Sequence, residues 1–213
     1  MDLIKLSTVI QIQIKTPPLK TSIKREIFWS MLTVPVFAAT AFFLVWGSQW
    51  GLVFIDVGSL SEYGLGRAFL YFLVYIILHD FYFYWIHRLM HHPYVFRKVH
   101  LVHHQSTNPS AFAAFSFHPI ESILEMLFFP LAVMALPHSH IAVVAWFFTV
   151  DFLINALAHG GAEWMPLRFR NTWLGSWINT ATHHNLHHQK VHGNYGFYFL
   201  FWDRICGTLM NES

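Results

Sequence analysis

The pentads HLVHH (residues 100–104) and HNLHH (residues 184–188) decide the architecture of this chain, because one histidine spacing occurs at two distant points. In a helix, residues i, i+3 and i+4 share a face, so each pentad can direct three imidazoles towards one point. Imidazole binds iron, copper and zinc, whereas magnesium and calcium prefer oxygen ligands. The pentads therefore predict two helices whose histidines meet at a transition-metal site.

The segment HDFYFYWIHRLMHH (residues 79–92) adds a third group of histidines. At about 100° per residue, His87 and His91 lie about 40° apart around a helix, and His79 lies on the same side. The whole set exceeds the three or four nitrogens that one zinc site uses, so we expect two metal ions. The candidate metal ligands are His79, His87, His91, His100, His103, His104, His159, His184, His187 and His188.

Other polar residues near these motifs are candidates for supporting roles. His118, in FHPIE, is expected to cap a helix or to support a ligand, and His183 could exchange roles with His184. His92 and His192 fall outside the spacing and are expected to be exposed. Four acidic residues in apolar runs are candidates for carboxylates that orient the histidines, because ionisable groups in such runs usually point inward. They are Asp80, Glu121, Glu125 and Asp151.

Composition places the chain in a membrane. Hydrophobic residues make up 55% and charged residues 11%, against roughly 25% charged in a soluble domain. Apolar runs of about 20 residues can cross a bilayer. We expect an all-α protein with a bundle of four membrane-spanning helices and a histidine-rich helical cap. The expected spans are residues 27–46, 66–85, 120–136 and 141–158, with Pro35 and Pro130 interrupting two of them.

Lysines and arginines predict the orientation. They precede the first span and follow the second and fourth, while residues 47–65 and 137–140 contain none. Positive charge favours the cytoplasmic side, so both termini and the histidine cap are expected there. His138 and His140 fall on the other side and are expected to bind no metal. We expect residues 1–26 to be a cytoplasmic tail and residues 27–213 one domain, and a net charge of +2 argues against nucleic acid.

The motifs together resemble a known family. HDFYFYWIHRLMHHP, KVHLVHH, AFSFHPIE and ATHHNLHHQKVHGNYGFYFLFWDRICGTL occur in order between residues 79 and 209. This is similar to the fatty acid hydroxylase and sterol desaturase superfamily of membrane di-iron oxidoreductases, most of all to its sterol C-5 desaturase and methyl-sterol oxidase branch. The resemblance implies that His87, His91, His100, His103, His104, His184, His187 and His188 are the catalytic metal ligands, with His79 and His159 as further ligands.

The resemblance also implies an activity and partners. Members use dioxygen and external electrons to hydroxylate or desaturate a C–H bond of a sterol or fatty acyl lipid, in lipid biosynthesis. The implied cofactor is two iron ions, which zinc could replace during purification. No HPGG haem motif occurs in the chain, so the electrons are expected from a separate donor such as cytochrome b5 or ferredoxin. The membrane would be the endoplasmic reticulum in a eukaryote and the cytoplasmic membrane in a bacterium.

Two other functions compete with this one. A histidine-rich membrane metal transporter would also bind metal, but it would spread its ligands through the membrane thickness, whereas these gather on one side. A catalytically inactive homologue that only binds lipid would have little physical need for so many aligned imidazoles. The sequence leaves open the substrate, the choice between hydroxylation and desaturation, and the oligomeric state.

Overall fold

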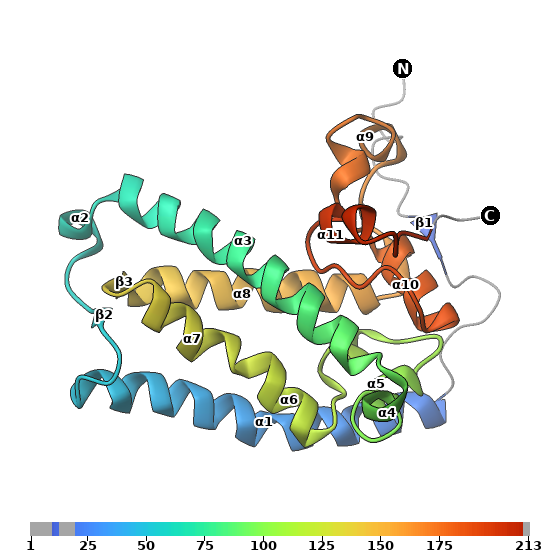
Figure 1. Cartoon of the computed structure of the whole chain (residues 1–213), viewed down its shortest axis with the longest axis horizontal. Coiled ribbons are helices and arrows are strands. Elements are labelled where there is room, and N and C mark those ends of the chain that lie inside the picture. Colours follow the sequence, from blue (N-terminus) through green and yellow to red (C-terminus); the bar gives the residue numbers. More distant parts are fainter. Residues whose placement is uncertain (1–9, 13–19, 211–213) are drawn as a thin grey trace.

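The computed structural model describes residues 10–12 and 20–210. Three long helices dominate it: α1 (Lys20–Gln49), α3 (Leu65–Met90) and α8 (Ile141–His159). By length and composition, each could cross a membrane. They run along the long axis of the molecule, and most of the short elements lie towards its two ends (Figure 1). The expected all-helical membrane architecture therefore has three candidate spans among the described residues.

The third expected span, residues 120–136, is divided. It forms α6 (Pro119–Met126) and α7 (Phe128–Ala135), which follow one another along the long axis (Figure 1). Pro130 lies in the first turn of α7 and has no N–H to donate to Met126, and its ring crowds that carbonyl. The interruption expected at Pro130 therefore leaves two short helices in this run, and neither is among the three candidate spans. Pro35, in contrast, lies inside α1, and the helix continues through it.

The other expected spans differ from the structure mainly at their ends. α1 begins at Lys20, so residues 20–26 of the expected tail form its first turns, and residues 1–9 and 13–19 lie outside the described part of the chain. α3 continues to Met90. The remaining elements are short: β1 (Ile10–Gln11), β2 (Ile55–Asp56), α2 (Leu60–Tyr63), α4 (Pro93–Phe96), α5 (Leu101–His104), η1 (Ala111–Phe115), β3 (Ser139–His140), β4 (Ala162–Glu163), α9 (Leu167–Arg170), η2 (Gly175–Trp177), α10 (Ala181–Lys190) and α11 (Phe201–Ile205).

Two small strand pairs fix the ends of the molecule. At one end β2 pairs in parallel with β3, which ties the loop after α1 to the turn before α8. His140 lies in this turn and caps α8, because its Nδ1 accepts a hydrogen bond from the amide of Ala142 at 3.0 Å. At the other end β1 pairs antiparallel with β4, beside the helices that carry the histidine pentads (Figure 1).

An aromatic core joins α3, α7 and α8. The Tyr75 ring stacks on Phe147 with centroids 5.4 Å apart, and Phe129 contacts Phe148 at 5.0 Å. The Tyr75 hydroxyl donates to the Ser139 hydroxyl at 2.8 Å, which satisfies its only polar group. Large side chains on the outward faces of the long helices, such as Phe42 and Ile77, remain exposed. Such surfaces suit contact with lipid.

We expect Gly175→Ala to destabilise the histidine end of the fold. A Cβ at this position would overlap the carbonyl group of Phe169, so the backbone would have to move. Such overpacking costs about 1–3 kcal/mol, which corresponds to a fall in Tm of roughly 2–12 °C for a chain of this size. Thermal unfolding in detergent measures this. The matched control is Gly66→Ala in α3, where no atom lies within 4 Å of the new methyl group. An unchanged Tm for Gly175→Ala would contradict the close approach.

Candidate metal centre

Nine imidazoles converge at one end of the molecule in two groups. Within each group, one ligand atom from every residue lies within 4.8 Å of all the others. The first group is formed by His87, His91, His100, His104 and His187. The second group is formed by His103, His159, His184 and His188. The rings come from α3 and its C-terminal cap, from α5 and the residue before it, and from α8 and α10, so the long helices and the short ones build the site together.

The ring nitrogens of the first group face one another. The Nε2 atom of His100 lies 3.1 Å from that of His87 and 3.1 Å from that of His104. The Nε2 atom of His104 lies 3.1 Å from that of His187. The His91 ring lies 4.7 Å, centroid to centroid, from the rings of His100 and His187. The group is therefore a closed cluster of nitrogen donors.

The second group has the same form with one fewer ring. The His159 Nε2 atom lies 2.9 Å from His184 Nε2 and 3.2 Å from His188 Nε2. His103 Nε2 completes the group at 3.4 Å from His159 Nε2. The two groups are neighbours, since the rings of His104 and His188 lie 4.8 Å apart.

Each pentad divides its histidines between the two groups. His100 and His104 enter the first group and His103 enters the second, whereas His184 and His188 enter the second group and His187 enters the first. The prediction that a pentad directs three imidazoles to one point was therefore wrong. Consecutive helical residues lie about 100° apart, which lets neighbouring histidines reach different centres.

Hydrogen bonds made by the Nδ1 atoms determine which ring nitrogens are unprotonated. The Nδ1 atoms of His87 and His187 donate to the carbonyl oxygens of Tyr195 and Gly193, at 2.9 and 2.7 Å. His159 Nδ1 donates to the Asn155 carbonyl oxygen at 2.8 Å. In neutral imidazole the other nitrogen, Nε2, then carries only a lone pair. These three rings thus present acceptor nitrogens to the interior of the groups.

Glu121 orients a fourth ring. Its Oε1 atom accepts a hydrogen bond from His100 Nδ1 at 2.7 Å, and both side chains are buried. The Nε2 atoms of His100 and His87 therefore face each other at 3.1 Å with no proton to share. Two lone pairs at this distance repel, and a cation between them removes the repulsion. The donor set fits metal ions with nitrogen ligands, and Glu121 lies behind His100 as expected of a carboxylate that orients a histidine.

Burial keeps the histidines of the pentads neutral. It lowers the pKa of His100, His103 and His104 well below the usual value, and the neighbouring histidines lower it further. Burial acts in the same way on the pKa of His184, His187 and His188. Neutral imidazole is the form that binds metal, so the site is ready for metal at neutral pH.

His79 lies outside both groups. Its ring packs among aromatic residues, 4.7 Å from the Phe128 ring, and its Nδ1 atom lies 3.5 Å from Asp151 Oδ1. His79 therefore lies beside the groups, about two turns before His87 on α3. The Asp151 carboxylate also accepts a hydrogen bond from the Tyr198 hydroxyl at 2.8 Å.

The remaining histidines also lie outside the two groups. His118 caps α6 through its Nδ1 atom, which accepts from the Ile120 amide, so the capping interpretation is confirmed. His183 contacts the Thr180 hydroxyl at 2.9 Å. His92 and His192 are exposed, as expected.

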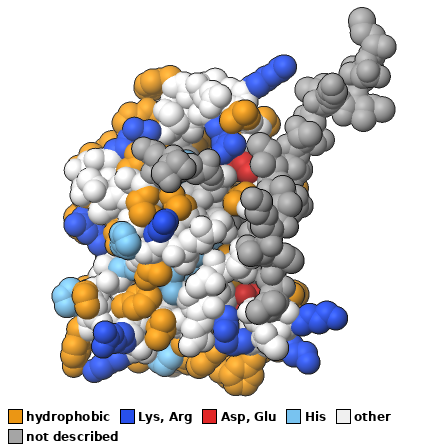
Figure 2. Space-filling model, turned by 90° about the vertical axis from the view of Figure 1, so that its right-hand side faces the viewer, with side chains coloured by type: hydrophobic (Ala, Val, Ile, Leu, Met, Phe, Trp, Pro, Cys, Tyr) orange, Lys and Arg blue, Asp and Glu red, His pale blue; other side chains and the backbone are white. Residues whose placement is uncertain are grey.

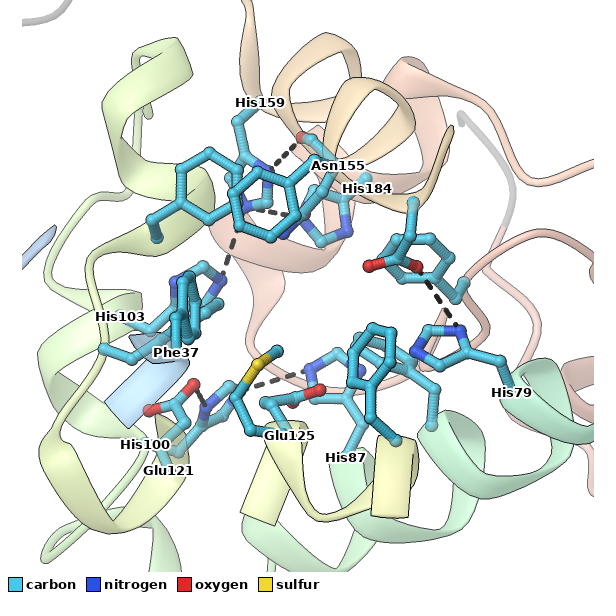
Figure 3. Close-up of a pocket in the computed structure, with 18 residues that line it drawn as sticks. Phe37, His79, His87, His100, His103, Glu121, Glu125, Asn155, His159 and His184 are labelled. Atoms are coloured by element: carbon cyan, nitrogen blue, oxygen red, sulfur yellow. Dashed lines mark hydrogen bonds and ion pairs between the residues drawn. The ribbon is translucent and has the colours of Figure 1, made fainter. Parts of the chain in front are cut away.

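A small cavity of about 30 Å³ opens between the two groups (Figure 3). Both groups line it, the first through His87 and His100 and the second through His103, His159 and His184. Most of its remaining wall is aromatic. The rings come from α1, α3, η1, α7, α8 and the segments around them: Phe37, Phe83, Phe115, Phe117, Phe129, Phe152 and Phe197. Sequence reasoning missed nearly all of these, since an isolated Phe in an apolar run carries no signal of its own.

The segment after α10 supplies the carbonyl groups of Gly193 and Tyr195 that hold two ligands. Asp203 fixes this segment, because its carboxylate accepts hydrogen bonds from the amides of Tyr195 and Gly196 at 2.9 and 2.8 Å. A Cβ on Gly196 would overlap the Phe199 carbonyl oxygen, so glycine is needed here for close approach. Val191, Gly193 and Asn194 in this turn all have a positive φ, and the value at Gly193 is the largest, +80°.

The sequence matches the model of one family, described as fatty acid hydroxylase, over residues 72–208. The chain belongs to the fatty acid hydroxylase family. The matched region begins inside α3 and contains all nine grouped histidines and the segment fixed by Asp203. No solved structure matches the chain.

Curated relatives in this family are named for sterol chemistry. The chain is 30% identical to human lathosterol oxidase over 92% of its own length and 64% of the human protein. It is 31% identical to a Delta(7)-sterol 5(6)-desaturase of Gibberella zeae, over 89% of the chain and 57% of that protein. Rat methylsterol monooxygenase 1 is 32% identical over 62% of the chain and 44% of its own length. These relatives confirm the expected sterol branch, although the chain spans less than two thirds of each.

We expect His187→Ala and His184→Ala to lower the bound metal by about one ion per chain each, because they remove nitrogens from different groups. His79→Ala should leave the metal content unchanged, since its ring lies outside both groups. Elemental analysis of purified protein expressed with added iron measures this. His192→Ala, at an exposed position, is the matched control. Full metal content in both His184→Ala and His187→Ala would contradict the two-group site.

The lowered pKa values also predict how the metal-free protein responds to acid. Below about pH 6.5 the unfolded chain binds more protons than the folded chain, whose buried histidines resist protonation. The free energy of unfolding therefore falls as the pH drops, by up to about 1.4 kcal/mol per pH unit for each such histidine. We expect the Tm of chelator-treated protein to fall steeply between pH 7.5 and 5.5. A flat profile over that range would show that the rings are not buried as neutral groups.

Proposed function

We propose that this chain is a membrane oxidoreductase with two iron ions that uses dioxygen and external electrons to hydroxylate or desaturate a C–H bond of a lipid. One observation supports this most. The two histidine groups line the same small cavity, and most of the rest of its wall consists of Phe rings (Figure 3). Nitrogen ligands next to an apolar pocket suit redox chemistry on an apolar substrate. When bound, iron supplies the redox chemistry that activates dioxygen for attack on the C–H bond.

The side chains of the protein have separate roles in this proposal. The grouped imidazoles hold the metal ions, and the carbonyl groups behind His87, His159 and His187 fix the orientation of those rings. Glu121 does the same for His100. The Phe rings exclude water from the cavity, which protects reactive species from side reactions. Placement of the substrate then decides between a hydroxyl product and an alkene.

We propose a sterol as the substrate class. The curated relatives named above carry the names of a lathosterol oxidase, a Delta(7)-sterol 5(6)-desaturase and a methylsterol monooxygenase. The three candidate spans expose apolar side chains from which a sterol could reach the cavity within the bilayer. Within this class we favour desaturation of a Δ7-sterol. A fatty acyl substrate remains the alternative within the same chemistry.

The proposal includes an orientation in the membrane. Figure 2 views the molecule from the end that carries the histidine groups, and Lys and Arg side chains surround the histidines on this face. Positive charge of this kind favours the cytoplasmic side. We therefore propose that residues 27–213 form one membrane domain, with α6 and α7 as its fourth segment, and with a cytoplasmic histidine cap and cytoplasmic termini. The basic face would suit an electron donor with an acidic surface, such as a separate cytochrome b5 or ferredoxin.

The test is turnover of a defined sterol by the purified chain loaded with iron. We expect lathosterol, dioxygen and a chemical or protein reductant to give a product two hydrogens lighter, detected by mass spectrometry, and no product under argon. His187→Ala should reduce turnover by at least about 100-fold, because it removes one nitrogen donor from the first group.

His138→Ala is the matched control, because this residue lies beside β3 at the opposite end of the molecule. Its turnover should equal that of the unchanged protein. An iron-loaded protein that consumes no dioxygen with either a sterol or an acyl lipid would contradict the proposed function.

A further inference from the structure

Three carboxyl groups face the cavity beside the histidine groups, and two of them have partners. Glu121 accepts a hydrogen bond from His100, and Asp151 accepts one from Tyr198 and lies beside His79. Glu125 also lines the cavity, but its carboxyl group has no hydrogen-bond partner among residues 10–12 and 20–210. A carboxyl group that is held in a largely aromatic wall without a hydrogen-bond partner costs free energy. A hydrogen-bond donor from a bound molecule would offset that cost.

The position of Glu125 on α6 places its carboxyl group next to the first histidine group. It lies one helical turn after Glu121 on α6, so both side chains project from the same face of the helix. Figure 3 shows the Glu125 carboxyl group pointing into the cavity between His100 and His87. Those two residues belong to the first histidine group, so a molecule that binds to Glu125 lies next to that group.

The free space next to Glu125 suits a small polar group. The cavity holds about 30 Å³, which is room for one or two water molecules or one hydroxyl group. Several side chains around it are aromatic rings from different elements, such as Phe37 on α1 and Phe152 on α8. A larger apolar body could enter only by displacing such rings, since the free space in the cavity is too small for it.

We propose that Glu125 accepts a hydrogen bond from a hydroxyl group of the lipid substrate and thereby determines which C–H bond faces the histidine groups. This inference rests on the proposed function and narrows its substrate to a lipid whose hydroxyl group lies close to the attacked carbon. A 3-hydroxysterol attacked at C5 has this property, because only one carbon atom separates C5 from C3, which carries the hydroxyl group. An acyl chain attacked far from its head group does not. Glu125 is in this sense a specificity-determining residue.

The experiment compares two sterols that differ only in this hydroxyl group: lathosterol and its 3-deoxy analogue. For the iron-loaded, full-length protein, we expect kcat/KM to favour lathosterol by about two- to tenfold, the usual net effect of one hydrogen bond. In Glu125→Leu this preference should fall to nearly one. Glu125→Gln should keep most of it, because the amide oxygen still accepts a hydrogen bond.

A matched variant separates this role from an effect on the metal site. Glu121→Gln lies one turn earlier on the same helix and weakens the support of His100, so it should lower turnover of both sterols and leave their ratio unchanged. Equilibrium binding of the two sterols to zinc-loaded protein gives a second measure that requires no turnover. There too, Glu125→Leu should abolish the preference for lathosterol.

The outcomes test the role of Glu125 separately from the proposed function. A preserved preference in Glu125→Leu, with wild-type turnover intact, overturns the role of Glu125 and leaves the proposed function standing. Loss of metal from Glu125→Gln also overturns it, because the side chain would then be a metal ligand. If the unchanged protein neither binds nor oxidises either sterol, both the proposed function and this inference fall. Metal content and Tm are measured for every variant, and Glu125→Gln provides the test if Glu125→Leu does not fold.

Discussion

Repulsion between imidazole lone pairs is the constraint on which this structure depends. His87 and His100 are held from behind by Tyr195 and Glu121, so their Nε2 atoms meet at 3.1 Å without a proton between them. Seven further rings surround them, of which six are buried and that of His91 is partly buried. Such an arrangement is costly without a cation and stabilising with one. The helices, the loop fixed by Asp203 and the carboxylate on α6 all act to hold these rings in place.

The sequence predicted which histidines lie together better than how they divide into groups. The spacing of HLVHH and HNLHH is enough to place histidines near one helical face, and eight of the nine grouped imidazoles are buried. The spacing could not show that His103 and His104 enter different groups, because that depends on how α5 lies against α10. His79 has the helical phase of a ligand, but it lies too far back along α3 and is packed among aromatic rings beside Asp151.

The sequence also predicted where the membrane segments lie better than where they are interrupted. Long apolar runs fixed α1, α3 and α8 to within a few residues, because hydropathy alone determines where such helices can lie. Pro130 divided the third run, while Pro35 left α1 continuous, and a sequence does not show which proline a helix will tolerate. The cavity was beyond sequence reasoning, since its Phe rings come from six or more separate segments.

The central claim is that two metal ions share these nine imidazoles, and X-ray absorption at the iron edge of the iron-loaded protein tests it most directly. The structure predicts two irons per chain, with five and four imidazole rings around them and no sulfur ligand. The outer-shell scattering should therefore be dominated by histidine. A single iron per chain, or a first shell dominated by carboxylate and water oxygen, would contradict the account.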